Sequence, residues 1–184
     1  MKYSDIIQYT QQANYYVNVE WGEINDKIQH ISSRNEYITE IIPDFQRGHV
    51  WTKKQQIKYI EFKLKGGTGS NDLLWNCPGW MTTFEGPYQL VDGLQRLTAV
   101  RMFINNKIPA FNIYHSEFKG RIPSHCEFLW HVNDLKTREE VLQWYIEINE
   151  GGIVHTKNEI DRVKQLLIAE NPKQRKLKCT KKNI

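Results

Sequence analysis

Apolar residues recur along the chain with two periods, one typical of strands and one typical of helices. The first thirty residues are polar and aromatic and show neither period clearly. Beyond them, short alternating or apolar runs predict five strands, at residues 36–42, 73–76, 80–84, 88–91 and 108–114. Pro43 ends the first of these strands, since proline cannot donate to a sheet.

Helix signals follow the strands. Residues 52–55, 137–140 and 156–159 have the Ser/Thr-x-x-Glu/Gln form of a capping box, and apolar residues at helical spacing follow each one. A fourth helical stripe follows Asp92-Gly93 and ends at Asn105-Asn106. The predicted order is strand, helix, strands, helix, strand and then two helices. This order predicts an α+β fold, with a small mixed sheet, flanking helices and a helical C-terminal part.

The pattern divides the chain into four parts. We assign residues 1–35 to an N-terminal extension and residues 36–115 to the core. Residues 116–170 form the helical C-terminal part, and residues 171–184 form a basic tail.

Charge changes the picture mainly at this tail. The chain carries a net charge of +4, but the tail holds six of its 25 basic residues and no acidic one. The remaining 19 basic residues face 21 acidic ones. The excess of positive charge that favours contact with nucleic acid therefore lies in the tail.

Cysteine count and hydropathy indicate the compartment. The three cysteines are odd in number and widely spaced, which fits neither a disulfide framework nor a zinc site. The chain starts without an apolar leader, and no run approaches the length of a membrane span. We expect a reduced, soluble, cytoplasmic protein without a membrane partner.

The strongest local candidate for chemistry is the strand-turn-helix at residues 90–104. Gly93 permits a tight turn, and the first N–H groups of the following helix have no partner within the helix, which favours an anion. Arg96 could take two phosphate oxygens, Gln95 could donate beside it, and Asp92 could accept a metal-bound water. The alternative is an ordinary Asp-Gly turn in which Asp92 caps the helix.

A second candidate, residues 43–51, places another Gln-Arg pair in a loop before a helix. Gln46, Arg47 and Trp51 could form a wall of a ligand site. The alternative is a structural loop in which Phe45, Val50 and Trp51 fill the core and Arg47 pairs with an acid. The glycine-rich residues 66–70 fit a flexible turn better than a phosphate cradle. The scattered histidines form no standard metal site, and His125, Cys126 and His131 are the nearest approach to one.

Three blocks in order resemble one known family, the GmrSD-type N-terminal domains of the ParB/sulfiredoxin-like superfamily. Residues 43–51 resemble its P-x-[FY]-Q-R-x-x-V-W signature, residues 90–99 its V-D-G-Q-Q-R-L-T-A signature, and residues 148–152 its I-N-x-G-G block. The resemblance implies a sheet whose strand-turn-helix binds nucleotide phosphates, often within restriction systems acting on phage DNA. A chain of this size is similar to stand-alone, phage-borne copies, which would place it in the host cytoplasm.

Carried over by position, Arg47, Asp92, Gly93, Gln95 and Arg96 match the conserved site of the family. Leu94 stands where the family has its first glutamine, which puts hydrolysis in more doubt than binding. The larger members also carry a His-Asn-His nuclease domain, and this sequence contains no such motif.

Two functions are therefore expected, of which nucleotide binding is the first. In it an NTP is bound, with slow phosphohydrolase or phosphotransfer activity. Asp92, Arg96 and Arg47 are the catalytic candidates, and Asp92 or Asp44 orients Mg²⁺ or the attacking water. The expected ligand-binding residues are Gln46, Arg47, Trp51, Gly93, Gln95, Arg96 and Thr98.

The alternative is a DNA-binding module without catalysis. In it the same basic residues, together with Lys53, Lys54, Lys58 and the tail, contact backbone phosphates. A ParB-like nuclease is a third option, and it would need a metal cluster that the sequence lacks. The pattern does not indicate the oligomeric state.

Overall fold

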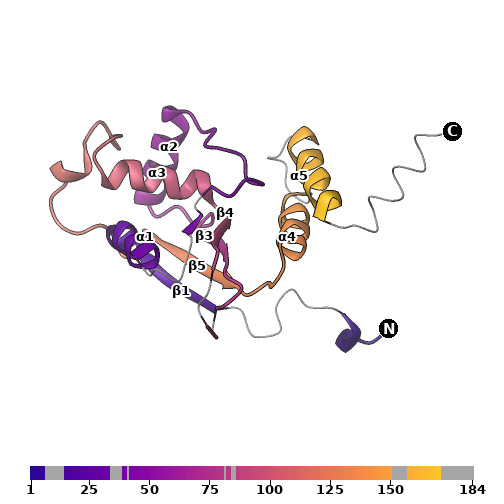
Figure 1. Cartoon of the computed structure of the whole chain (residues 1–184). Helices are drawn as coiled ribbons and strands as arrows, with labels where there is room; N and C mark the ends of the chain where they lie inside the picture. Colours follow the sequence, from indigo (N-terminus) through magenta and orange to yellow (C-terminus); the bar gives the residue numbers. More distant parts are fainter. Residues whose placement is uncertain are drawn as a thin grey trace.

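A mixed five-stranded sheet with helices packed around it forms the body of the protein (Figure 1). The computed structural model describes residues 1–6, 15–33, 39–40, 42–80, 82–83, 86–150 and 157–170. The strands are β1 (Tyr15–Glu20), β2 (Thr39–Glu40), β3 (Asp72–Asn76), β4 (Tyr88–Asp92) and β5 (Glu127–Asn133). The helices are α1 (Ile24–Ser33), α2 (Lys53–Leu64), α3 (Leu94–Ile104), α4 (Arg138–Glu150) and α5 (Lys157–Glu170). Short 3₁₀ helices are η1 (Tyr3–Asp5), η2 (Trp21–Glu23) and η3 (His115–Glu117). The predicted α+β class is confirmed.

The strands lie in the order β1-β5-β3-β4-β2. β5 pairs antiparallel with β1 and parallel with β3, while β4 pairs antiparallel with β3 and parallel with β2. Leu73 and Trp75 of β3 lie opposite Trp130 and Val132 of β5. This register brings large apolar side chains of neighbouring strands together on one face.

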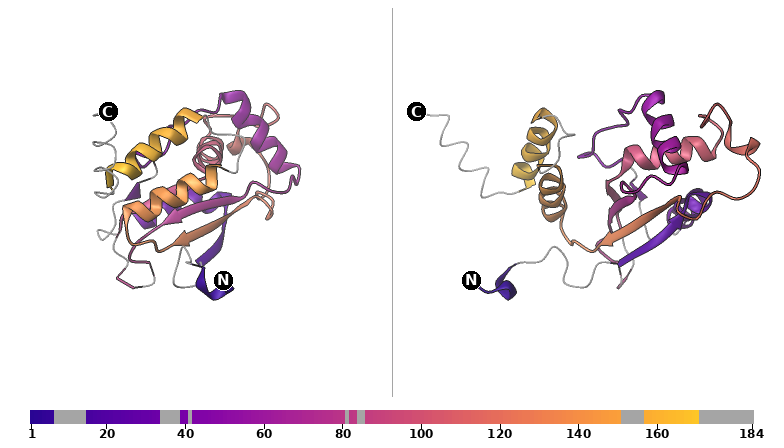
Figure 2. Two further views of the ribbon diagram at one scale, coloured as in Figure 1. Left: turned by 90° about the vertical axis from the view of Figure 1, so that its right-hand side faces the viewer. Right: turned by 180° about the vertical axis from the view of Figure 1, so that it is seen from behind.

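Helices cover both faces of the sheet, and two consecutive residues of β4 pack against helices on opposite faces. Leu90 packs into the larger core, which also contains apolar residues of α1, α2 and α3. Val91, the next residue, packs into a second core with Phe45 and apolar residues of α4 and α5. Because successive side chains of a strand point to opposite faces, β4 must be apolar at both positions. Figure 2 shows α4 and α5 on the side of the sheet away from α1.

Two of the predicted strands are wrong where the structure describes them. Trp80, Thr82 and Thr83 lie in turns rather than in a strand. Residues 108–114 form turns with a single antiparallel bridge between Ala110 and Ile113. Phe111 and the following asparagine have left-handed backbone, with φ angles of 52° and 63°, which a strand cannot accommodate. Of the strand predicted at residues 36–42, the structure describes strand only at Thr39–Glu40, and Ile42 lies outside it; residues 36–38 and 41 lie outside the described ranges.

Three elements were missed by the apolar pattern. β1 and α1 lie in the part assigned to the N-terminal extension, and β5 lies in the part assigned to helices. β5 does alternate, because Phe128, Trp130 and Val132 are buried, but the apolar Leu129 between them obscures the pattern. The missed strand is central: it joins β1 to the remainder of the sheet.

Two of the three predicted capping boxes are confirmed. The Thr52 hydroxyl accepts from the Gln55 amide, and the Gln55 side chain accepts from the Thr52 amide. Thr137 and Glu140 make the same reciprocal pair. The third box, at residues 156–159, begins outside the described residues. These caps fix where α2 and α4 begin, and both helices supply residues to the site below.

Two cysteine thiols are predicted to be unreactive. Cys77 and Cys126 form no disulfide and are fully buried, and burial raises the pKa of each thiol to about 11. At pH 8 roughly one in a thousand of each would be thiolate, the reactive form. Titration with a disulfide reagent should detect at least two fewer thiols in the folded protein than in guanidinium chloride. Rapid reaction of all three cysteines in the folded protein would contradict the prediction.

Candidate functional site

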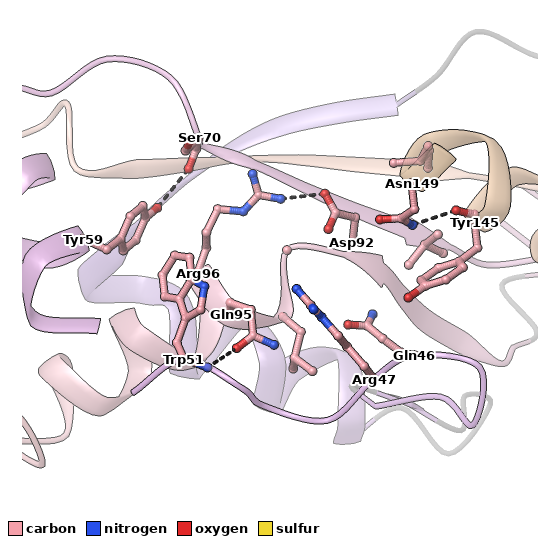
Figure 3. Close-up of a pocket in the computed structure, with 14 residues that line it drawn as sticks. Gln46, Arg47, Trp51, Tyr59, Ser70, Asp92, Gln95, Arg96, Tyr145 and Asn149 are labelled. Atoms are coloured by element: carbon pink, nitrogen blue, oxygen red, sulfur yellow. Dashed lines mark hydrogen bonds and ion pairs between the residues drawn. The ribbon is translucent and has the colours of Figure 1, made fainter. Parts of the chain in front are cut away.

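A cavity of about 290 Å³ lies where the β4–α3 turn, the loop before α2, and α4 meet (Figure 3). It brings the two predicted Gln-Arg pairs together, although 49 residues separate them in the sequence. Its lining residues are Gln46, Arg47, Trp51, Tyr59, Ser70, Val91, Asp92, Gly93, Leu94, Gln95, Arg96, Tyr145, Ile148 and Asn149. Two segments singled out separately in the sequence therefore form one site.

Gly93 shapes the turn at the bottom of this cavity. Its φ angle is +102°, and it is the residue that precedes the first turn of α3. A Cβ at this position would lie 2.4 Å from Cδ2 of Leu73 and 3.1 Å from the carbonyl oxygen of Asp72. Glycine is thus required both for the backbone conformation and for the close approach of the neighbouring strand. The turn places Leu94, Gln95 and Arg96, the first turn of α3, on the cavity wall.

Asp92 and Arg96 form an ion pair within this turn. Nη2 of Arg96 donates to Oδ2 of Asp92 at 2.7 Å, and the arginine side chain is only 18% exposed. The carboxylate holds the guanidinium at the start of α3, where the backbone N–H groups already favour an anion. Arg47 reaches the same cavity from the loop before α2 (Figure 3). The site therefore contains two guanidinium groups and a helix N-terminus, against one carboxylate.

The two glutamines hold the two segments against each other. Nε2 of Gln46 donates to the carbonyl of Leu90 in β4 at 2.7 Å. In the reverse direction, Oε1 of Gln95 accepts from the amides of Val50 and Trp51 at 2.9 and 3.0 Å, and its Nε2 donates to the carbonyl of Gly48. The side-chain amides of both glutamines, which the sequence assigned to a ligand, therefore bond backbone groups in this structure. Gln46 thus ties its loop to β4, the strand that leads to Arg96, and Gln95 holds the loop that carries Arg47.

Loss of the Gln95 contacts should loosen the loop that carries Arg47. We expect Gln95→Ala to lower the free energy of unfolding by about 1–2 kcal/mol, because two backbone amides and a carbonyl lose their partner. Gln143→Ala is the matched control, because its exposed side chain bonds only Glu147 on the same helix. Denaturant unfolding measures both, and equal, near-zero effects would contradict the role assigned to Gln95.

Aromatic side chains form the wall next to Arg96. The rings of Trp51 and Tyr59 lie 5.4 Å apart between centroids, and the Tyr59 hydroxyl donates to the carbonyl of Ser70 at 2.9 Å. Burial raises the pKa of the Tyr59 phenol, and the nearby positive charge of Arg96 opposes that shift only in part. Tyr59 is therefore a neutral, fixed ring at neutral pH, with Trp51 against it.

A buried lysine organises the glycine-rich loop beside this wall. Lys63 is 1% exposed, and its Nζ donates to the carbonyls of Gly67 and Gly69 and to Oδ1 of Asn71. Burial lowers the pKa of this lysine. Since these loop carbonyls bond Lys63, residues 66–70 form an ordered turn that brings Ser70 to the cavity. The sequence predicted a flexible turn here, whereas the bonds to Lys63 hold these residues in place.

α4 closes the cavity on the opposite side. Tyr145, Ile148 and Asn149 line it, and the buried Asn149 donates from Nδ2 to the carbonyl of Tyr145 at 2.7 Å. These residues, with Tyr59 and Ser70, were not among the predicted site residues. The signal that could have found two of them is the third sequence block, which begins at Ile148-Asn149.

Some predicted residues lie elsewhere. Thr98 is not among the lining residues of the cavity. Asp44, expected as an alternative to Asp92, instead accepts two hydrogen bonds from Nη2 of Arg138 and faces a different depression of the surface.

The histidines and cysteines form no metal centre in the described part of the chain. His131 pairs with Asp72, whereas the side chains of His125 and Cys126 contact the Lys63 carbonyl. Across the described ranges no three His, Cys, Asp or Glu side chains are grouped so that they could hold a metal ion.

Fold and site together define a small α+β domain with a recessed, arginine-lined cavity at a strand-turn-helix. Residues 28–168 match the family described as the N-terminal domain of the GmrSD restriction endonuclease. The match covers well over half of the 184 residues, and the chain belongs to this family. Its function is accordingly related to restriction endonucleases. Comparisons with curated proteins and with solved structures gave no match. None of the helices described here is long and apolar enough to cross a membrane.

Proposed function

We propose that the cavity binds a nucleoside triphosphate and that the protein hydrolyses it slowly. The observation that supports this most is the meeting of Arg47, Arg96 and the N-terminus of α3 in one recessed cavity. A volume of about 290 Å³ lies at the lower end of the range for small-molecule sites. Partial burial strengthens the attraction between guanidinium groups and phosphate oxygens.

The phosphates are assigned to the start of α3. There the N–H groups of the first turn of α3, Arg96 and Arg47 can all donate to phosphate oxygens. In hydrolysis, water attacks the γ-phosphorus and the nucleoside diphosphate leaves. The two arginines would stabilise the negative charge that develops on the transferred group.

Trp51 is assigned to contact the base of the nucleotide, because the flat base can stack on the indole ring. Tyr59 holds Trp51 from behind. The base would thus lie at the end of the cavity bounded by α2, away from α4.

Asp92 fits a Mg²⁺ ion that accompanies the triphosphate. Its Oδ2 pairs with Arg96, while no donor among the described residues contacts its Oδ1. Magnesium in nucleotide sites is commonly held by one or two carboxylates plus the phosphates, so one available oxygen is sufficient. The ion would neutralise charge on the phosphates.

The position of the arginines favours a small ligand over a duplex. Arg96 is recessed and paired with Asp92, so a DNA backbone would have to enter the cavity to reach it. Lys53, Lys54 and Lys58 are exposed on α2 and remain available to the DNA-binding alternative. Salt distinguishes the two: backbone binding weakens steeply with ionic strength, whereas binding in a recessed pocket weakens far less.

Calorimetric titration with ATP, GTP, CTP and UTP, each with Mg²⁺, tests the proposal. Saturable binding to at least one nucleotide is expected, followed by phosphate release above the background without protein. Binding that survives moderate salt would favour the pocket. Absence of binding to all four nucleotides, in protein folded by circular dichroism, would reject the proposal.

A further inference from the structure

Exposed rings and positive charges gather on the segment between α3 and β5. This segment lies at the end of the molecule away from α4 and α5, as Figures 1 and 2 show. Three aromatic side chains of this segment, Phe111, Tyr114 and Phe118, and Phe62 of α2, which the segment contacts through Glu61, are each 39–50% exposed. None of them lines the cavity around Gly93. Exposed rings in one group, rather than singly, mark a contact surface.

The segment is held in place by side chains of α2 and by its own turns. The amide of Phe111 donates to Oε1 of Glu61 at 2.8 Å, and the amide of Tyr114 donates to Oε2 of Glu117 at 2.8 Å. The ring of Phe118 packs edge-on against the buried Phe103, with 6.0 Å between centroids. The rings are therefore presented by a fixed framework.

Phe111 in particular is held in an unfavourable backbone conformation. Its φ angle is +52°, in the left-handed region that a bulky side chain rarely adopts. Strain of this kind persists only where the surrounding structure enforces it, and it concentrates at ligand-binding positions. Here it keeps the ring 40% exposed, with Nζ of Lys65 5.3 Å from its centroid.

Cations accompany the rings. A depression of about 300 Å³ next to Phe118 is lined by Lys119 and Arg121, both exposed, and Lys65 lies at the end of α2 beside Phe111. The two nearby acids, Glu61 and Glu117, accept hydrogen bonds from backbone amides of the segment. With three cations against these two carboxylates, the named groups carry a net charge of +1.

We propose that this surface, formed by Phe62, Lys65, Phe111, Tyr114, Phe118, Lys119 and Arg121, binds single-stranded nucleic acid. Unstacked bases stack on exposed rings while cations follow the phosphates, and the combination tolerates any sequence. A duplex hides the faces of its bases, so it could use the cations but not the rings. An apolar protein partner could use the rings but would have to desolvate the cations.

Fluorescence anisotropy of the full chain measures the affinity for a labelled single strand of about 20 thymidines or uridines and for a duplex of equal length. The proposal expects tighter binding of the single strand. Phe111→Asn is the sharpest variant, because asparagine adopts left-handed backbone readily and the fold should tolerate it. Loss of one stacking ring should weaken single-strand binding at least about 5-fold. Tyr114→Ala should act likewise, and Tyr3→Ala, which removes a 93% exposed ring at the other end of the chain, should have no effect.

Three results would overturn the proposal: no binding of either single strand, equal or tighter binding of the duplex, or unchanged affinity in both ring variants. Self-association by sedimentation that is lost in Phe111→Asn would instead identify the surface as a contact between copies. Arg96→Ala should bind the single strand as the unmodified protein does, so failure of the nucleotide proposal remains distinguishable.

Discussion

Arg96→Ala should weaken nucleotide binding by at least about 100-fold. Charge-assisted hydrogen bonds contribute about 1.5–3 kcal/mol each, and Arg96 is placed to make two with phosphate oxygens. Removal of the guanidinium also leaves Asp92 without its 2.7 Å partner, so the carboxylate assigned to Mg²⁺ is no longer held in position. Both effects act in the same direction, which makes this the largest binding effect expected of any single substitution in the cavity.

Arg101→Ala is the matched control for this prediction. Arg101 lies on the same helix, outside the cavity, and its Nε donates to Asn25. Calorimetry should find nucleotide affinity unchanged in this variant, with both proteins folded by circular dichroism. Arg96→Lys should fall between the two, since lysine keeps the charge but not the planar pair of donors. An Arg96→Ala protein that binds nucleotide as the unmodified protein does would show that the phosphates are not held at the start of α3.

The part of the site that the sequence predicts is the part built from near neighbours. Asp92, Gly93 and Arg96 lie within five residues, and turn chemistry with the start of a helix determines how they are placed. Such local rules need no knowledge of the remainder of the fold. Arg47 was a candidate from its own loop, but no local rule connects it to Gly93, and only the resemblance to the family placed the two in one site.

The residues that the sequence did not predict reach the site through tertiary packing. Tyr59 lines the cavity because α2 packs on α3, and Asn149 does so because α4 packs on β4 through the second core. Residue type was also an incomplete guide: the amide of Gln95 suits a phosphate, but in the structure it bonds three backbone groups. A side chain's partner depends on what the fold brings within 3 Å of it.

The sheet shows the same division between local and distant information. β4 was predicted because its short run is mostly apolar and a glycine turn ends it. β5 was missed, although its pairing with β1 and β3 makes it central to the sheet. Conversely, residues 108–114 have strand-forming composition, but two left-handed residues interrupt the backbone, and the Phe111 amide donates to Glu61 instead of to a neighbouring strand. Composition favours a strand only where a neighbour is available to pair with it.

Gly93→Ala should be the most destabilising single substitution in the β4–α3 turn. A φ angle of +102° is unfavourable for any residue with a Cβ, by about 1–2 kcal/mol or more. The added methyl would also lie 2.4 Å from Leu73 and 3.1 Å from a backbone carbonyl that cannot easily move. Overpacking of this kind costs about 1–3 kcal/mol. The combined loss of about 2–5 kcal/mol should lower Tm by roughly 5–20 °C in a chain of this length.

Gly66→Ala separates the two causes. Gly66 also has a positive φ angle, +85°, but no atom lies within 4 Å of where its Cβ would be. This control therefore carries the backbone penalty without the collision, and its Tm should fall by only a few degrees, about 2–8 °C. Scanning calorimetry of both variants measures the difference. Equal losses would mean that Leu73 moves aside freely and that close packing of β3 against the turn does not hold α3 in place. A larger loss in Gly93→Ala would show that β3, the turn and the start of α3 are fixed together, as a preformed phosphate site requires.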